Sequence, residues 1–263
     1  MAPWAAVSAA LVISQPCFAA LDTSTDTQRI EREELKQNDD PTILRRRVWW
    51  ENEYSNLHQG AWQHKLTLGG LYAFSLSPDS EWGVRLKVPV VWANGGRDPV
   101  VDNQAGLGDV ELAVATAWRL APTFRAACGL ETKFNTAAPD ALGDGTTQLK
   151  PILAFSWDAA RWLTLAPSST YNRSVAAEPD ASDVSNLELN LPFIFLLPRR
   201  SYVTVEYKGV LDFERDDGYS NTLKIATGKL LTEWIQLYAS VEVPLEAATA
   251  NFRVTVGMNF FLQ

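Results

Sequence analysis

Two adjoining segments of period-two alternation, residues 109–120 and 124–135, constrain the fold more than any other feature of the sequence. In each segment, apolar side chains recur at every second position, with mostly polar or small side chains between them. Because successive side chains of a strand point to opposite faces of a sheet, each segment is predicted to be a long strand with one apolar and one polar face. The short Ala121-Pro122-Thr123 turn between them makes the pair a hairpin.

Strand length and aromatic positions indicate which face is inside. Each predicted strand has roughly a dozen residues, enough to cross a bilayer at the usual tilt, whereas strands of soluble sheets average about five or six. Aromatic belts at both ends of an apolar band are typical of transmembrane barrels with a polar lumen. We therefore predict an all-β, single up-and-down antiparallel transmembrane β-barrel of the outer-membrane type, with a soluble lipocalin-like barrel as the alternative. The aromatics predicted to lie at the membrane interfaces are Trp82, Trp92, Trp118, Phe124, Phe134, Trp157, Trp162 and Trp234.

The alternation recurs from Val48 to the C-terminus and predicts about twelve strands. Long polar loops begin near Asn94, Thr136, Val175 and Arg215, whereas the turns between them have only a few residues. Bacterial outer-membrane barrels place short turns in the periplasm and long loops outside, and an even number of strands returns both termini to one side. We therefore expect a barrel in the outer membrane of a Gram-negative cell, in contact with outer-membrane lipids and with both termini periplasmic.

The N-terminal region is expected to direct export and then to precede the barrel. Residues 1–20 have the pattern of a signal peptide, with an apolar run from Ala5 to Ile13 but no Lys or Arg before it. Residues 21–47 are highly charged and lack the alternation, which predicts a periplasmic leader that is mobile or forms a short helix. A plug inside the barrel is the alternative for this leader. The predicted barrel comprises residues 48–263.

Composition and spacing exclude several classes of function. A net charge of −8 without a basic cluster argues against nucleic-acid binding. No apolar run reaches the length of about eighteen residues that a membrane-spanning helix needs. We expect no metal site, because no third ligand accompanies the two histidines at a telling spacing, and we expect no cofactor.

A surface lipid-modifying enzyme is a rival class, because His58 and His64 lie on the first predicted hairpin with Ser55 close in sequence. Nucleophilic catalysis requires a base within hydrogen-bond reach of the nucleophile and a third group that orients the base. The sequence shows no serine motif on a neighbouring strand and no matching asparagine. We therefore expect no enzyme and interpret both histidines as interfacial residues.

The polar faces carry charges of both signs in nearly equal number. A midplane Arg or Lys facing lipid costs about 2–4 kcal/mol, so these side chains are predicted to line the lumen. They either line a narrow aqueous pathway for a small-molecule solute and tune its selectivity, or pair into a network that fills the lumen. We favour the small channel. The predicted lumen residues are Arg85, Lys87, Asp109, Glu111, Arg119, Arg125, Glu131, Lys133, Lys150, Glu188, Glu206, Lys208, Asp212, Lys224, Glu242 and Arg253.

The last predicted strand ends in a pattern that resembles the C-terminal assembly signal of outer-membrane barrels. The matching residues are Thr255, Gly257, Phe260 and Leu262. That signal usually ends on an aromatic residue, whereas here Leu262 and Gln263 close the sequence. The resemblance implies the barrel-assembly machinery and periplasmic chaperones as partners.

A second resemblance concerns the long loops and the strands that follow them. Gly106-Leu107-Gly108-Asp109 opens a strand after one loop, and residues 143–151 follow another. With the repeated long hairpins, these stretches resemble the outer-membrane barrels of the MetA-pathway phenol-degradation family, from about Asn94 onward. The resemblance implies a transporter with small aromatic or apolar compounds among its solutes, and it supplies no catalytic residues. The predicted function is therefore passive, porin-like passage of small solutes, with a non-conducting structural barrel as the alternative.

Overall fold

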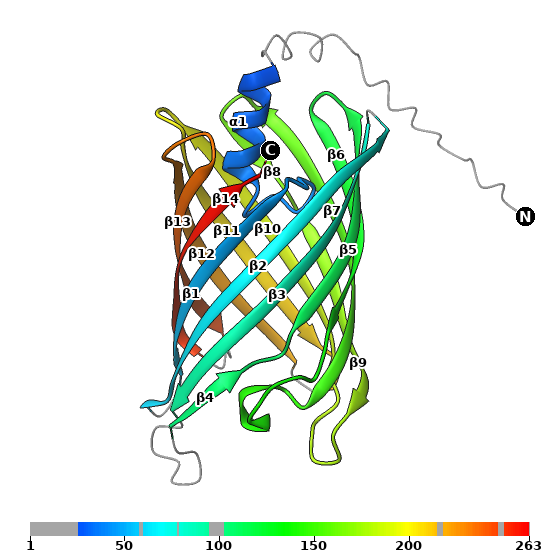
Figure 1. Cartoon of the computed structure of the whole chain (residues 1–263), viewed down its shortest axis with the longest axis vertical. Coiled ribbons are helices and arrows are strands. Elements are labelled where there is room, and N and C mark those ends of the chain that lie inside the picture. The colour runs from blue at the N-terminus through cyan, green and yellow to red at the C-terminus, as the bar shows by residue number, and fades with distance from the viewer. Residues whose placement is uncertain are drawn as a thin grey trace, which may run out of the picture.

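A computed structural model describes residues 26–57, 60–77, 79–94, 103–214, 218–246 and 250–262. The predicted signal peptide, the first residues of the leader and His58 lie outside the described residues. The described strands form one antiparallel sheet that closes on itself, because β1 (Arg47–Leu57) pairs with both β2 (Trp62–Ser77) and β14 (Ala250–Phe261). The result is a barrel with tilted strands (Figure 1).

The remaining strands follow one another around the barrel in chain order. They are β3 (Ser80–Asn94), β5 (Glu111–Ala121), β6 (Phe124–Lys133), β7 (Thr146–Ala160), β8 (Leu163–Leu165), β9 (Ser168–Ala177), β10 (Ser185–Leu197), β11 (Ser201–Asp212), β12 (Tyr219–Leu230) and β13 (Ile235–Glu246). Both β8 and β9 pair with β7 and β10, so they are two parts of one crossing strand, interrupted at Pro167. Proline has no backbone N–H for the ladder. Counted this way, the described chain forms the predicted barrel of twelve crossing strands.

The register of the β5–β6 hairpin confirms the predicted alternation. Glu111 lies opposite Lys133, and the pairing continues to Arg119 opposite Arg125. The outward Val114 is 45% exposed, whereas the inward Ala113 and Ala117 are 6% and 2% exposed. Apolar side chains therefore cover the outside of the barrel and would face lipid, and small or charged side chains face the lumen.

The two ends of the barrel differ in their connections. The short turns, helix α1 (Asp26–Lys36) and the C-terminus gather at one end, which we call the helix end (Figure 1). The connections that follow β3, β6, β9 and β11 begin at the other end, the loop end. At the loop end, β4 (Gln104–Leu107) extends the sheet beside β3, and a short 3-10 helix (Asp140–Leu142) follows β6. The long loops thus share one end, as predicted from their lengths.

The predicted interface aromatics divide between these two ends. Trp82, Trp118, Phe124, Trp157, Trp162 and Trp234 lie on or beside the short turns of the helix end, and Trp92 and Phe134 lie at the loop end. Phe124 stacks on Phe155 and Trp162 stacks on Phe195, with ring centroids 6.1 and 6.2 Å apart. Their contact with the membrane interfaces stays a prediction.

The described part of the leader is folded into the helix end of the barrel. Residues 26–36 form α1, and the segment that follows contains Asp40 and Thr42, neither of which is exposed at all. Leu35 and Ile43 are also buried. The polar groups of the leader bind partners on the polar lumen wall, and composition alone does not predict these contacts. None of the described helices has the length and hydropathy of a membrane span.

Candidate functional site

The barrel encloses a cavity of about 730 Å³, which we call the first cavity. Inward-facing side chains from strands all around the sheet line it, and residues 37–44 of the leader close it toward the helix end. At the loop end it reaches Asp109, Lys133 and Asp144. The lumen is therefore neither filled by its own wall nor fully open along its length.

Three cations and two carboxylates form one network on the β3–β7 side of this cavity. Lys87 Nζ lies 2.6 Å from Glu111 Oε2, and Lys150 Nζ lies 3.2 Å from Glu131 Oε1 and 3.6 Å from Glu111 Oε1. The Arg85 guanidinium donates to Glu131 Oε2. The strand register brings these groups together, because Lys87 is opposite Glu111 and Glu131 is opposite Lys150.

The β10–β12 wall carries two further ion pairs. Lys208 Nζ lies 3.0 Å from Glu188 Oε2, and Lys224 Nζ lies 3.0 Å from Glu206 Oε2. Lys224 also reaches the leader, with its Nζ 2.9 Å from Asp39 Oδ1. This second contact links the charge pattern of the wall to the position of the leader.

A third cluster crosses the seam where the barrel closes. Arg253 on β14 lies within 3.2 Å of Glu242 on β13 and within 3.4 Å of Glu53 on β1. Lys65 on β2 binds the same Glu53 carboxylate at 3.0 Å. The two glutamates and two cations fall opposite one another in the register, so their pairing follows from strand alignment. The wall charges of all three clusters are thus paired across strands.

Asp109 lines the first cavity at the loop end and also holds a loop there. Its Oδ1 accepts the backbone N–H groups of Thr136 and Ala137, both at 3.2 Å, and its Oδ2 accepts that of Asp144 at 3.1 Å. Lys133 Nζ completes the site at 3.5 Å. Gly106 allows the same loop to approach, because a Cβ there would overlap the carbonyl oxygen of Ala138. The motif of residues 106–109 therefore anchors the loop of residues 134–145.

Polar contacts hold the leader to the β11–β14 wall. Gln236 Nε2 donates to the carbonyl oxygens of Glu34 and Leu35, both at 3.1 Å, which satisfies free acceptors at the C-terminal end of α1. Asn259 Nδ2 donates to Asn38 Oδ1 at 3.0 Å, and Thr204 donates to Asp39 at 2.9 Å. Burial raises the pKa of the Glu34 carboxyl, and the nearby Arg45 opposes that rise.

A second set of contacts joins the leader to β7 and β8. Ser156 Oγ donates to Asp40 Oδ2 at 2.6 Å, and Lys36 Nζ lies 2.7 Å from Asp158 Oδ1. Lys36 also donates to Thr164 Oγ1 at 3.3 Å. Because the leader is bound on two sides of the barrel, it is fixed across the lumen.

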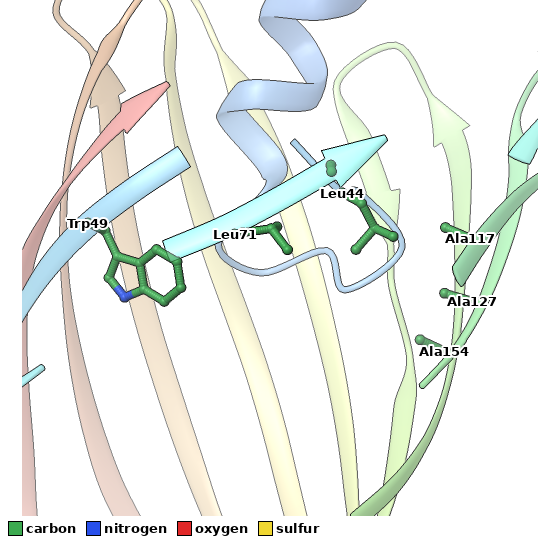
Figure 2. Close-up of a cluster of buried hydrophobic side chains, with 7 residues drawn as sticks. Leu44, Trp49, Leu71, Ala117, Ala127 and Ala154 are labelled. Carbon is green, nitrogen blue, oxygen red and sulfur yellow. The ribbon is translucent and has the colours of Figure 1, made fainter. Parts of the chain in front are cut away.

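Two apolar seats complete the docking of the leader. Leu35 joins a buried cluster with Ile194 and Tyr202 of the wall. The other seat is formed by Leu44, Trp49, Leu71, Ala73, Ala117, Ala127 and Ala154. Figure 2 shows Leu44 between Leu71 and the three alanines of β5, β6 and β7. These alanines leave room for the leader where larger side chains would fill the lumen.

A smaller cavity of about 60 Å³ lies beside α1 at the helix end, and we call it the second cavity. Glu33 lies between two arginines there, with its Oε1 2.8 Å from Arg119 Nη2 and 2.9 Å from Arg125 Nη1. Arg125 also binds Glu81 at 3.1 Å. The other lining residues are Arg29, Arg32, Lys36, Pro122, Thr123, Ser156, Asp158 and Ala160. Two of the predicted lumen arginines therefore bind the leader and border this cavity.

Among the other predicted site residues, Asp212 lies at the loop end, where its Oδ1 accepts the backbone N–H of Glu214 at 3.0 Å. Thr255 of the predicted assembly signal lines the first cavity, and Gly257 lies under the Tyr238 ring, where a Cβ would not fit. Phe260 is half-buried and Leu262 is exposed. These positions are compatible with an assembly signal, whose recognition stays a prediction.

Sequence reasoning missed two kinds of site residue. Glu53 and Lys65 occupy inward positions of β1 and β2, and the alternation of those strands could have identified them. The leader residues Lys36, Asp39 and Asp40 had no such signal, because they belong to no strand. His64 contacts the rings of Tyr54 and Trp62 at the loop end.

Comparison with known proteins shows which solved structures share this fold. No protein-family model matches the sequence, and no curated protein sequence matches it. Among solved structures, the COG4313 outer membrane channel from Pseudomonas putida F1 matches with a TM-score of 0.71 and 12% identity, over 83% of this chain and 96% of that one. The NanC porin matches with a TM-score of 0.58 and 13% identity, over 82% and 100% of the two chains. The KdgM porin gives 0.54 and 14%, over 82% and 99%.

At these identities the likeness concerns the fold. All three matched proteins are described as outer-membrane channels or porins, and each match covers most of both chains. Together with the closed register of the sheet, these matches show that the chain is a closed, twelve-stranded antiparallel β-barrel of the outer-membrane type.

Proposed function

We propose that the protein is a channel for passive passage of small solutes across the outer membrane, narrowed at one end by its own leader. The first cavity of about 730 Å³ carries this proposal, because a purely structural barrel has no need of a large polar space in its lumen. Barrels of about eight strands are filled by side chains and those of about sixteen are open, and twelve strands lie between these limits.

The direction of the channel follows from its loops. We propose that the loop end faces outside and the helix end faces the periplasm, because outer-membrane barrels keep their short turns on the periplasmic side. This places the leader and the C-terminus in or at the periplasm. The proposed topology also includes the signal peptide of residues 1–20, assembly by periplasmic chaperones and the barrel-assembly machinery, and outer-membrane lipids around the barrel.

The proposed solutes are small, with aromatic or apolar compounds among them. The apolar seat around Trp49 and Leu71 offers a surface for such compounds within an otherwise charged lumen. The resemblance of residues 106–109 and of the following hairpins to the MetA-pathway family supports the same class. The KdgM porin has been described in complex with oligogalacturonate. We do not extend acidic oligosaccharides to this chain, because the cations of its three wall clusters are paired with carboxylates.

Planar-bilayer recording of the purified mature chain tests the proposal. We expect discrete openings of low conductance from the intact chain, because the leader closes the first cavity toward the helix end and the second cavity beside it is small. A variant that lacks residues 26–45 should conduct several times more current. Addition of a small aromatic solute should produce transient blocks.

The matched control keeps residues 26–45 and carries the single substitution Arg45→Gln. Both variants must keep the heat-dependent gel mobility of a folded barrel. A folded barrel that inserts but conducts neither with nor without its leader would overturn the channel and favour a non-conducting structural barrel.

A further inference from the structure

We infer that the second cavity is the selective constriction of the channel and that it favours small anions, carboxylates included. This inference rests on the proposed channel function and adds the path past the leader and the charge preference of that path. It concerns residues that lie outside the three ion-pair clusters of the first cavity.

One hydrogen bond joins a lining residue of the first cavity to a lining residue of the second. Asp40 lines the first cavity and Ser156 lines the second, and Ser156 Oγ donates to Asp40 Oδ2 at 2.6 Å. The wall beside this contact is built from Ala117, Ala127 and Ala154, the alanines that receive Leu44 in Figure 2. The inferred path between the two spaces runs along this wall and opens when residues 40–44 move away from it.

The charges of the two cavities differ in sign. Eight cationic and ten acidic side chains line the first cavity, whereas five cationic and two acidic side chains line the second. The five cations are Arg29, Arg32, Lys36, Arg119 and Arg125, and the two acids are Glu33 and Asp158. The narrow space carries excess positive charge even when Glu81, which binds Arg125, is counted with the two acids. Rings of Arg and Lys are the usual device of anion-conducting pores.

Two of these arginines hold donors that the described residues leave unused. The Nε atoms of Arg32 and Arg125 are buried and have no hydrogen-bond partner in the described part of the chain. Both Nη groups of Arg125 already bind carboxylates, those of Glu33 and Glu81, so its Nε–H is the donor left for an anion. The cavity of about 60 Å³ has room for a few water molecules or one acetate-sized anion. Focused positive potential in so narrow a space raises the local concentration of anions.

Reversal potentials in a potassium chloride gradient, and in a potassium acetate gradient, test this inference with the full mature chain. The intact channel should prefer either anion over potassium. The double variant Arg119→Gln/Arg125→Gln should lower the anion-to-potassium permeability ratio at least about threefold, because it removes two of the five cations. Glu33→Gln should raise the ratio, because it removes one of the two acids.

This pair of variants separates selectivity from loosening of the leader. Both break the same ion pairs at Glu33, so loosening would change the two conductances in the same direction, whereas the permeability ratios should move in opposite directions. Lys229→Gln is the control, because Lys229 lies on the exposed side of β12 at the same end of the barrel. This change should leave the anion-to-potassium permeability ratio unchanged.

The possible results are distinguishable from failure of the proposed function. Absence of current from both the intact chain and the variant that lacks residues 26–45 would overturn the channel and this inference together. Current with a preference for potassium, or a ratio that the Arg119→Gln/Arg125→Gln and Glu33→Gln variants move in the same direction, would overturn the inference alone.

Discussion

Replacement of Leu44 by alanine tests how firmly the leader is held in the barrel. The Leu44 side chain is 8% exposed and packs in the seat formed by Leu71 and the wall alanines. Truncation of a buried leucine to alanine costs about 2–5 kcal/mol in protein cores. Because Leu44 also borders the first cavity, where water can occupy the vacated space, we take the lower limit of about 2 kcal/mol.

That loss corresponds to about a thirtyfold increase in the population of released leader, since each 1.4 kcal/mol is about a factor of ten. Trypsin cleaves after Lys and Arg, and the docked leader keeps Lys36 buried. When release and docking are fast relative to cleavage, the cleavage rate follows the population of the released form. We therefore expect trypsin to remove the leader of the Leu44→Ala variant about thirtyfold faster, as followed by mass spectrometry of the detergent-solubilised barrel.

Leu130→Ala is the matched control, because Leu130 is 47% exposed on the outer face of β6. This change should leave the cleavage rate within about twofold of that of the parent chain. An unchanged rate in a folded Leu44→Ala barrel would refute the docking argument. Equal acceleration by the control would show that the barrel, and not the seat, had been weakened.

Three further changes test separate parts of the site. Asp109→Asn replaces one acceptor oxygen of the side chain by a donor, and an unsatisfied buried group costs about 1–3 kcal/mol. The backbone amides of residues 136–144 should therefore exchange with deuterium at least about fivefold faster. Unchanged exchange would contradict the anchoring role of Asp109. Lys224→Met leaves the buried Asp39 carboxylate without its cation and should speed tryptic removal of the leader at least about tenfold. The double variant with Asp39→Asn should bring the cleavage rate part of the way back to that of the parent chain. A double variant that is cleaved as fast as Lys224→Met would argue against the ion pair. Because burial raises the pKa of Glu34, the docked leader binds that proton more tightly than the released one, so docking should strengthen as the pH falls toward the ordinary Glu pKa of about 4.3. Hydrogen exchange of α1 should show this dependence in the parent chain and lose it in Glu34→Gln.

The barrel itself could be predicted closely from local patterns. The period of two in segments such as residues 109–120 depends only on the alternation of side chains across a strand, so it revealed strand length, face and hairpin partner. The lengths of the connections then predicted which loops share one end. The interruption at Pro167 was not among the predictions, although a proline within a strand pattern often marks a break in the ladder.

The candidate site could be predicted only in part. The inward charges of β3, β5, β6 and β7 were predicted from their positions, but their pairing depends on which residues of neighbouring strands lie opposite one another. The alternation predicted Asp109 on the polar face, whereas its role in anchoring a loop depends on backbone N–H groups almost thirty residues away. A sequence pattern does not contain that distance.

The leader is the part of the chain whose position depends most on tertiary structure. Its composition is that of a segment with too little apolar surface to fold alone, and this reasoning holds for an isolated chain. Inside the barrel, Leu35 and Leu44 find apolar seats, and Asp39 and Asp40 find donors on strands more than a hundred residues away. Alternation along the chain thus determined the barrel, because strand faces are a local property. The closed register decided the ion pairs, the docked leader and the two cavities, because these depend on partners that only the finished barrel brings within reach.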